Sequence, residues 1–421
     1  MKKRSWLALA LALALALSLL SACAEKKPAT STPPPLPPKD KIVIGGSRPI
    51  SGVYAVFNTT GFGPVFRMWV KEVNAKGGIY IKEYDKKMEI DLKIYDDGSE
   101  MDRMVSNLEK LILDDKVDIL IPPCSTATLF AAAPIAAQYG KVLLGAEGGA
   151  SALREYTSRY PTFFGPINCS TTQVPALVEI FKEKNVKSAY VVFIEDLFGT
   201  EYSGAIIPAL TSIGVDIKAV KSVAPDVSDM SSFITDAKAS GAEAFLLLAY
   251  PDQNFGAIGA AMGLGYNPDL FLLGPGGGFD FIQYLFPVEG VMSFGAWNAK
   301  SSPAAADYLA KYMAYITDNP DEAEASIDWW GHLPYYMSLQ VLEQAIEKAG
   351  TLDNSAIAKI IASEEFDTCM GKVHFENNIL APDCFMGNVG QWQNGTFEVI
   401  DVNPAKRTAA PIIPKPAWPA G

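Results

Sequence analysis

The amino-acid sequence predicts an α/β protein with two doubly wound parallel-sheet units, and three observations lead to that prediction. Residues 41–421 are a stretch long enough for two domains, since single cores rarely grow beyond about 250–300 residues. Short continuous apolar runs alternate with amphipathic segments, as buried parallel strands alternate with the helices that cover both faces of their sheet. The alternation occurs in two successive sets, the second starting near Gly165.

The first set starts with a short apolar strand. Its helices have apolar positions at helical spacing, and a glycine pair ends the first of them. The expected order is strand 41–46, helix 63–78, strand 89–97, helix 100–115, strand 117–123, helix 127–140 and strand 141–149.

The second set repeats this rhythm. Several of its strands are continuously apolar, which is typical of strands buried on both faces. The expected order is helix 172–185, strand 188–196, helix 201–214, strand 216–224, helix 230–241, strand 243–250, helix 252–267 and strand 270–277.

The amino-terminal segment has the layout of a secretory signal. Basic residues precede an apolar run at 6–20, which is short for a membrane span, and small residues stand before Cys23. We expect a lipoprotein signal peptide at 1–22 and lipidation of Cys23; the alternative is an ordinary signal peptide cut nearby. Residues 23–40 are rich in proline, so we expect an extended linker there. We expect residues 416–421 to form a short tail.

Composition excludes some classes of function. The formal net charge is −12, so there is no basic excess to neutralise phosphates, and we expect no nucleic-acid partner. The G-x-x-x-x-G-K-[ST] phosphate loop and the G-x-S-x-G elbow are absent, and neither histidine stands beside a recognisable nucleophile. We therefore expect no catalytic set, no cofactor and no enzyme activity.

Cysteines and histidines predict no metal site. The four cysteines after Cys23 lack C-x-x-C spacing, and His332 and His374 stand far apart in the sequence. Cys369 and Cys384 flank an expected hairpin and are candidates for a disulfide in an oxidising envelope, although their pairing stays open.

Segments that follow strands hold the candidate binding residues, because ligands of doubly wound sheets bind beyond the carboxyl ends of the strands. Ser125 and Thr126 follow strand 117–123 and open a helix, where they can cradle an anion or simply cap the helix. Glu147 stands in a glycine-rich strand exit and can accept a hydrogen bond from a ligand or cap the next helix.

Aromatic side chains near these strand exits suit either an apolar pocket wall or core packing. They are Phe57, Phe198, Tyr250, Trp329, Trp330, Tyr335 and Tyr336.

Three segments, at 51–79, 92–112 and 131–151, resemble the solute-binding proteins of branched-chain amino-acid ABC importers, the type I periplasmic binding proteins. "EVNAKGGI" and "YDD" are the more specific parts, and the resemblance continues through the chain from about Lys41. It implies two lobes joined by a three-strand hinge, which close on a ligand. Lobe 1 would hold 41–165 and 297–382, and lobe 2 would hold 166–296 and 383–415.

The resemblance also implies a function. The chain would be a monomeric, lipid-anchored receptor on the periplasmic or extracellular face of a bacterial membrane, delivering a small ligand to a permease. A sensor that feeds a signalling partner is the alternative. An amidase-type enzyme and a structural envelope lipoprotein are weaker ones.

Family binding roles carry over to particular positions. Ser125 and Thr126 match the grip on the ligand carboxylate, and Phe57 and Phe198 stand where amino-acid binders often carry tyrosine. Tyr250 keeps the aromatic of the second lobe. The first-lobe loop corresponds to Glu147, Gly148 and Gly149, with Gly149 in place of a threonine.

Gly276 stands where leucine binders carry a glutamate against the ligand ammonium. A buried ammonium without a counter-charge costs several kcal/mol. The ligand could therefore be an amide, a urea-like compound or an aromatic or aliphatic carboxylate, or Glu147 could supply the charge instead. The phenylalanines lead us to expect a bulkier ligand.

Overall fold

A computed structural model describes residues 37–149, 152–401 and 403–419. The predicted signal peptide 1–22, the lipidation site Cys23 and most of the linker lie outside the described residues. Asp40–Gly421 forms one compact unit, to which the elements below belong. No helix in the described part of the chain is both long and apolar enough to cross a membrane.

The first sheet has β1 near its centre. In order across the sheet, its strands among the described residues are β2 (Ile79–Ile81), β3 (Lys86–Asp96), β1 (Lys41–Arg48) and β4 (Ile119–Leu120). β1 runs parallel to β3 and β4, whereas β2 runs antiparallel to β3. Most of β1 is buried, which explains the apolar run at 42–44.

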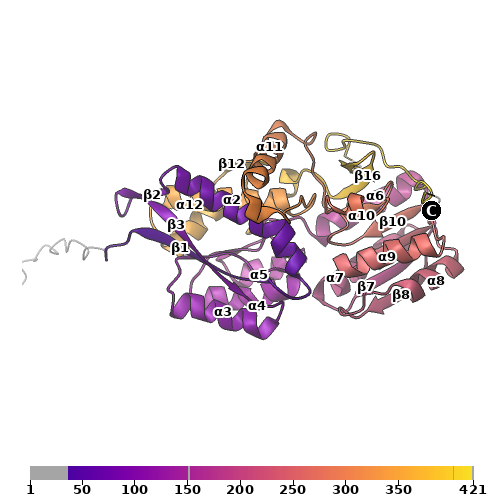
Figure 1. The fold of residues 1–421 in the computed structure, drawn as a ribbon, viewed down its shortest axis with the longest axis horizontal. Helices are drawn as coiled ribbons and strands as arrows, with labels where there is room; N and C mark the ends of the chain where they lie inside the picture. Colours follow the sequence, from indigo (N-terminus) through magenta and orange to yellow (C-terminus); the bar gives the residue numbers. More distant parts are fainter. Residues whose placement is uncertain (1–36, 150–151, 402, 420–421) are drawn as a thin grey trace, which may run out of the picture. The chain divides into compact units, whose positions relative to one another are not determined.

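Helices cover both faces of the first sheet (Figure 1). They include α2 (Gly63–Ala75), α3 (Met101–Leu113), α4 (Thr126–Gln138), α11 (Pro303–Asp318), α12 (His332–Ala349) and α13 (Asn354–Ser363). α2 packs with α11 and α12, while α3 packs with α4. Right-handed crossovers put α2 and α3 on opposite faces.

The second sheet is larger. Its strands in the described ranges, in order across the sheet, are β17 (Thr396–Val399), β16 (Val389–Gln393), β11 (Met292–Phe294), β10 (Leu270–Leu273), β9 (Ala244–Leu248), β7 (Ser188–Ile194) and β8 (Asp216–Val223). The strands from β11 to β8 are parallel, and β16 and β17 are antiparallel additions at one edge.

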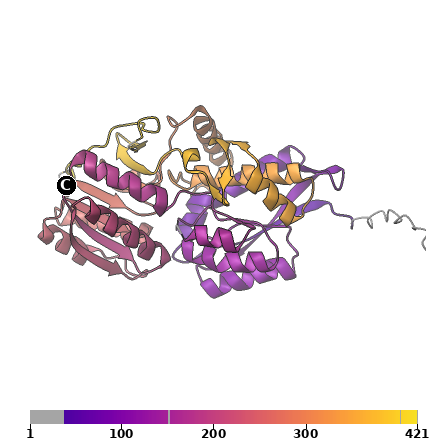
Figure 2. The same cartoon turned by 180° about the vertical axis from the view of Figure 1, so that it is seen from behind.

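Helices also cover both faces of the second sheet (Figure 2). They are α6 (Ser170–Lys184), α7 (Leu197–Ser212), α8 (Ser231–Ser240), α9 (Pro251–Gly263) and the short α10 (Ile282–Leu285). α6 packs with α7 and α8 packs with α9. The two crossovers from β7 to β8 and from β8 to β9 run in opposite directions, so α7 and α8 lie on opposite faces.

Smaller elements complete the fold. They are α5 (Leu153–Arg159), the pairs β5 (Leu143–Leu144) with β6 (Phe163–Phe164), β12 (Phe366–Thr368) with β13 (Gly371–Val373) and β14 (Phe375–Glu376) with β15 (Ile379–Leu380), the π-helix η2 (Phe57–Phe62), and the 3₁₀ turns η3 (Pro320–Glu322) and η4 (Pro382–Cys384).

These elements fall into two groups. We call the first sheet, its helices, α5 and the three strand pairs the first group, and the second sheet with α6–α10 the second group. The described chain passes between the groups near 165–169, 295–302 and 381–388. The exact lobe boundaries, 41–165 with 297–382 and 166–296 with 383–415, stay predictions.

The predicted α/β fold class is confirmed, and each predicted helix and strand of the two sets appears near its expected place. Two strands are much shorter than expected: 141–149 becomes the two-residue β5, and 117–123 becomes the two-residue β4. Pro122 and Pro123 follow it, and proline lacks the N–H that would continue the ladder.

Candidate functional site

A small cavity lies where strands of both sheets end. Its volume is about 50 Å³. Its walls follow β1, β4 and β5 in the first group and β7, β9 and β10 in the second group, which is the usual place for ligands of such sheets. The lining residues are Phe57, Phe62, Cys124, Ser125, Thr126, Glu147, Gly149, Ile167, Phe198, Tyr250, Pro275, Asp328, Trp330 and Gly331.

A buried ion pair underlies one side of the cavity. Arg48, the last residue of β1, places Nη1 2.5 Å from Glu147 Oε1 and Nη2 3.0 Å from Oε2. Neither side chain is exposed to solvent. The guanidinium also donates to Asn58 Oδ1 at 3.1 Å and to the carbonyl of Pro122 at 2.6 Å. Burial opposes the charge of Arg48, yet the Glu147 carboxylate outweighs it and raises the pKa of Arg48.

This ion pair changes the expected role of Glu147. The sequence suggested that its carboxylate could balance a ligand ammonium. In the structure both carboxylate oxygens already face Arg48, so the charge is neutralised within the protein. Glu147 still lines the cavity, where it shapes the wall and anchors the loop after β5.

Asp328 is a second carboxylate at the cavity. Its Oδ1 accepts from the N–H of Trp330 and its Oδ2 from the N–H of Gly331, both at 3.0 Å. Within the described chain, no lysine, arginine or histidine side chain forms an ion pair with it. Burial raises the pKa of Asp328 to about 6, against the opposing effect of the two backbone N–H groups. Asp328 is therefore the carboxylate whose charge a ligand could balance.

Ser125 caps helix α4. Its Oγ accepts from the N–H of Thr128 at 3.3 Å, which satisfies one of the donors that a helix leaves unpaired at its start. Its φ of 96° is uncommon for serine, and such backbone strain occurs preferentially at binding sites. Thr126 is buried beside it and also lines the cavity. The capping interpretation is thus confirmed, and the ligand role of both residues stays a prediction.

Aromatic rings from both groups meet at the cavity. Phe57 of the first group contacts Tyr250 of the second edge-to-face, with ring centroids 6.0 Å apart. Phe198 stacks on Tyr250 at 5.6 Å. The Tyr250 hydroxyl donates to Asp196 Oδ2 at 2.7 Å, and burial raises the pKa of Asp196. Three of the seven predicted aromatic residues therefore lie together at the cavity.

Phe57 and Phe62 are the first and last residues of the π-helix η2. A π-helical turn is rare and is frequently found at functional sites, where the extra residue redirects side chains. Both rings line the cavity, so this irregular turn contributes two residues to the wall.

Trp330 bridges the two groups. Its Nε1 donates to Asn168 Oδ1 at 2.8 Å. A Cβ on Gly295 would lie 2.0 Å from the Trp330 ring, and Gly295 has φ of +65°, so only glycine fits there. A Cβ on Gly149 would lie 3.3 Å from the same ring. The Trp330 ring, together with Tyr202 Oη at 3.2 Å from the same Cβ position, thus leaves little room for a threonine at position 149.

Gly148 and Gly276 do not line the cavity. Of the predicted aromatic residues, Trp329, Tyr335 and Tyr336 do not line it either. A Cβ on Gly148 would lie 2.6 Å from the side chain of Leu129, so this glycine serves packing. At Gly276 the φ is +93° and a Cβ would lie 2.7 Å from the ring of Pro251. A glutamate at Gly276 would therefore be strained, and the neighbouring Pro275 lines the cavity instead.

The candidate disulfide is not formed. Cys369 and Cys384 are both free thiols, as is Cys124. Cys369 Sγ lies 3.5 Å from the carbonyl oxygen of Leu333, towards α12, whereas Cys384 Sγ faces His374. The two residues flank the predicted hairpin in sequence, but their thiols point to different neighbours.

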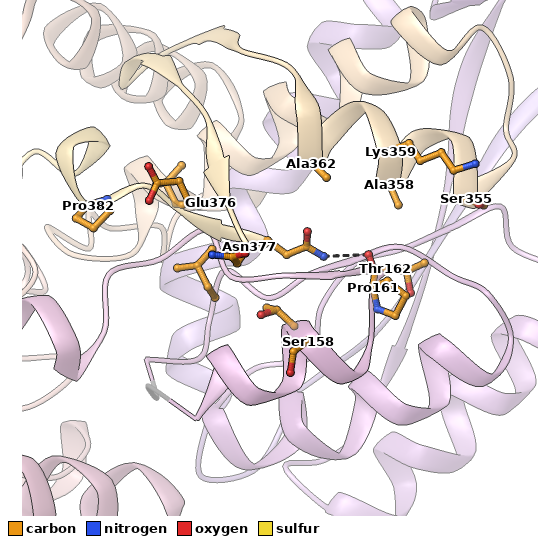
Figure 3. A pocket seen from close by; sticks show the side chains of 14 residues that line it. Ser158, Pro161, Thr162, Ser355, Ala358, Lys359, Ala362, Glu376, Asn377 and Pro382 are labelled. Carbon is orange, nitrogen blue, oxygen red and sulfur yellow. Dashed lines mark hydrogen bonds between the residues drawn. The ribbon is translucent and has the colours of Figure 1, made fainter.

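A larger hollow lies elsewhere, between α5, α13 and the β14–β15 hairpin (Figure 3). Its volume is about 850 Å³, and Asn378 Nδ2 donates to the carbonyl of Pro161 within it at 2.9 Å. Its lining is mostly small polar side chains, proline and alanine, without buried charges or aromatic rings. The smaller cavity has buried carboxylates, hydroxyl groups and aromatic rings at the strand ends, so it is the better ligand site.

Sequence reasoning missed Arg48 and Asp328. Arg48 stands two residues after the predicted strand 41–46, and a charged residue so close to the end of a strand was a signal for it. Asp328 has no such signal, because it reaches the cavity through a non-regular segment that pairs with Phe279 of the second group.

Comparison with known proteins agrees with this geometry. The model of the family described as periplasmic binding protein matches residues 41–395. The chain belongs to this family. Its members are binding proteins, and the type I periplasmic binding protein fold predicted from the sequence is confirmed.

Individual relatives are distant. The Leu/Ile/Val-binding protein homolog 7 of Brucella suis biovar 1 (strain 1330) is 22% identical over 52% of this chain and 55% of that relative, so the chain spans about half the length of the curated relatives it matches. LivJ of Streptococcus pneumoniae, solved with isoleucine, is 18% identical with a TM-score of 0.72, covering 86% of this chain and 98% of that one. A solute binding protein of Rhodopseudomonas palustris BisB5, solved with 3,4-dihydroxybenzoic acid, is 16% identical with a TM-score of 0.71, covering 85% and 95%.

Proposed function

We propose that this chain is the lipid-anchored receptor of an ABC importer, which binds a small solute between its two groups and delivers it to a permease. The cavity at the strand ends of both sheets carries the proposal. A ligand that contacts both groups favours their closed arrangement, because it binds that arrangement more tightly than an open one. Membership of the periplasmic binding protein family supports a binding role.

The chemistry of the cavity narrows the ligand. The start of α4, with Ser125 and Thr126, suits a carboxylate or carbonyl oxygen. The buried carboxylate of Asp328 suits an ammonium or an amide N–H. We therefore favour a small amino acid or amide, with Asp328 taking the place of the carboxylate that Gly276 cannot supply.

The size of the cavity favours a compact ligand. Its volume of about 50 Å³ is roughly one third of the ~150 Å³ cavity that holds benzene in an engineered protein. Phe57 and Phe198 had suggested a bulkier ligand, but their rings fill the space beside Tyr250. A benzoate would require these walls to move apart.

A thermal-shift screen of residues 41–421 tests this proposal. The panel is glycine, alanine, leucine, acetamide and benzoate. A ligand at 100 times its Kd adds about 2.7 kcal/mol of stability, so a fitting compound raises the Tm clearly. We expect the response from the small amino acids or the amide. Stabilisation by benzoate alone would refute the ligand assignment, and no response to any compound would count against the binding role.

The contribution of Asp328 can be tested with a matched pair of variants. We expect Asp328→Asn to weaken binding of an amine-bearing ligand at least tenfold, or about 1.4 kcal/mol, because the ammonium loses its counter-charge. The control is Asp280→Asn, since Asp280 lies next to the same segment but bonds to Trp329 Nε1 and Gln283 Nε2 outside the cavity. Equal affinities of the two variants, measured by calorimetry, would exclude Asp328 from the ligand contact.

A further inference from the structure

A second cluster of reactive side chains lies on the β14–β15 hairpin, away from the ligand cavity. His374 precedes β14, and Asp383 and Cys384 belong to the turn η4 after β15. Cys384 Sγ lies 3.8 Å from His374 Nδ1 and 3.9 Å from Asp383 Oδ1. One ligand atom from each of the three residues lies within 4.8 Å of the others.

We propose that His374, Asp383 and Cys384 form a binding site for a zinc-like divalent cation, with a fourth position left for water. Imidazole nitrogen, carboxylate oxygen and thiolate sulfur are the ligand types of tetrahedral zinc sites. With Zn–S of about 2.3 Å and Zn–N of about 2.0–2.1 Å, tetrahedral geometry separates sulfur and nitrogen by about 3.6 Å. The Sγ to Nδ1 distance of 3.8 Å is close to this value.

A carboxylate on the far side of the imidazole supports the site. Glu376 Oε1 lies 3.8 Å from His374 Nε2, opposite the nitrogen that faces Cys384. This distance is longer than a hydrogen bond, and a rotation that moves the Glu376 carboxylate by about 1 Å would let it accept the Nε2 proton, which leaves the lone pair of Nδ1 towards the cation as in many zinc sites. Glu376 lies at the edge of the larger hollow (Figure 3).

The backbone holds the three ligands in place. The N–H of Ala381 donates to the carbonyl of His374 at 3.1 Å, and the N–H of Cys384 donates to the carbonyl of Ala381 at 3.0 Å. Lys406 Nζ donates to the carbonyl of Phe385 at 2.5 Å and ties down the residue after the turn. Asp383 is exposed and Cys384 is a free thiol, so a cation can reach the site from solvent and the sulfur is available.

The sequence pattern did not indicate this site, because the cysteines lack C-x-x-C spacing and the two histidines stand far apart in the sequence. His374 and Cys384 stand ten residues apart, a spacing that matches no familiar zinc motif. The hairpin reverses the chain and brings them together.

Cobalt(II) titration of the purified full chain tests the site. A thiolate bound to Co²⁺ gives an intense near-ultraviolet charge-transfer band, which Zn²⁺ then abolishes by displacement. We expect one equivalent of Co²⁺ to produce this band. We expect Cys384→Ser to remove the band. We expect His374→Ala, and Asp383→Asn at an exposed residue, each to weaken Co²⁺ binding at least tenfold. Glu376→Gln should weaken it by about 10–100-fold through the imidazole.

Cys369→Ser is the matched control, because Cys369 is also a buried thiol but faces Leu333. It should leave the band unchanged. A wild-type chain without the band would overturn the proposal, and so would a band that survives in Cys384→Ser. If Cys384→Ser fails to fold, Asp383→Asn decides: unchanged Co²⁺ affinity in that variant would contradict the site.

Discussion

Replacement of Arg48 by methionine should destabilise the protein strongly. Methionine keeps much of the apolar stem but removes the guanidinium, which donates to Glu147, Asn58 and Pro122. Glu147 then remains as a fully buried carboxylate without its partner. Loss of one member of a buried ion pair costs about 3–5 kcal/mol, so we expect the free energy of unfolding to fall by that amount.

Urea unfolding, followed by tryptophan fluorescence, measures this loss, and the comparison is valid where the m-value is unchanged. The control is Arg67→Met. Arg67 also forms a two-pronged contact, with Glu322 at 2.7 and 2.6 Å, but its side chain is 40% exposed. Solvent screening reduces the expected loss there to about 1 kcal/mol.

The double variant Arg48→Met/Glu147→Gln provides the decisive comparison. It removes both charges, so we expect it to be more stable than Arg48→Met alone by about 1–3 kcal/mol. The reasoning would be refuted if Arg48→Met cost no more than Arg67→Met, or if the second substitution restored nothing.

Three further predictions concern pH, packing and the membrane. The pKa of Asp328 is raised to about 6 from an ordinary value of 3.8, so between these pH values the folded protein binds a proton that the unfolded protein does not. Its stability should therefore fall by about 3 kcal/mol as the pH rises from about 4 to 6, relative to Asp328→Asn. Urea unfolding without ligand at several pH values measures this fall. Gly295→Ala should destabilise the protein by several kcal/mol, because the added Cβ clashes with Trp330. The control Gly259→Ala, in α9 with no atom near the added Cβ, should stabilise the protein by about 0.5–1 kcal/mol. A similar Tm shift in both variants would contradict the packing argument. Cys23→Ser should move the protein from the detergent phase to the aqueous phase in a partition assay, and retention in the detergent phase would exclude Cys23 as the anchor.

Much of the fold could be predicted because its signals are local. The helix 63–78 and the strand 188–196 appear as α2 and β7, since apolar spacing over one window already decides between the two structures. The segment 117–123 was less predictable, because the length of a strand depends on how far its neighbour pairs with it.

The candidate site was predicted only in part. Ser125, Glu147 and Tyr250 follow predicted strands, so the rule for strand ends identified them. Asp328 and Trp330 escaped this rule, because they come from a segment that no strand precedes directly. They reach the cavity only when this segment pairs with the second group.

The sequence by itself determined the alternation of strands and helices, the likeness to a binding-protein family and the edge of the sheets where a ligand would bind. These follow from periodicity and from residues close in the chain. Only the tertiary structure decided which carboxylate is neutralised and which is not. Glu147 meets Arg48 across 99 positions, while Asp328 is buried against backbone N–H groups alone. Charge pairing depends on distances in space, and no local pattern of residues specifies them.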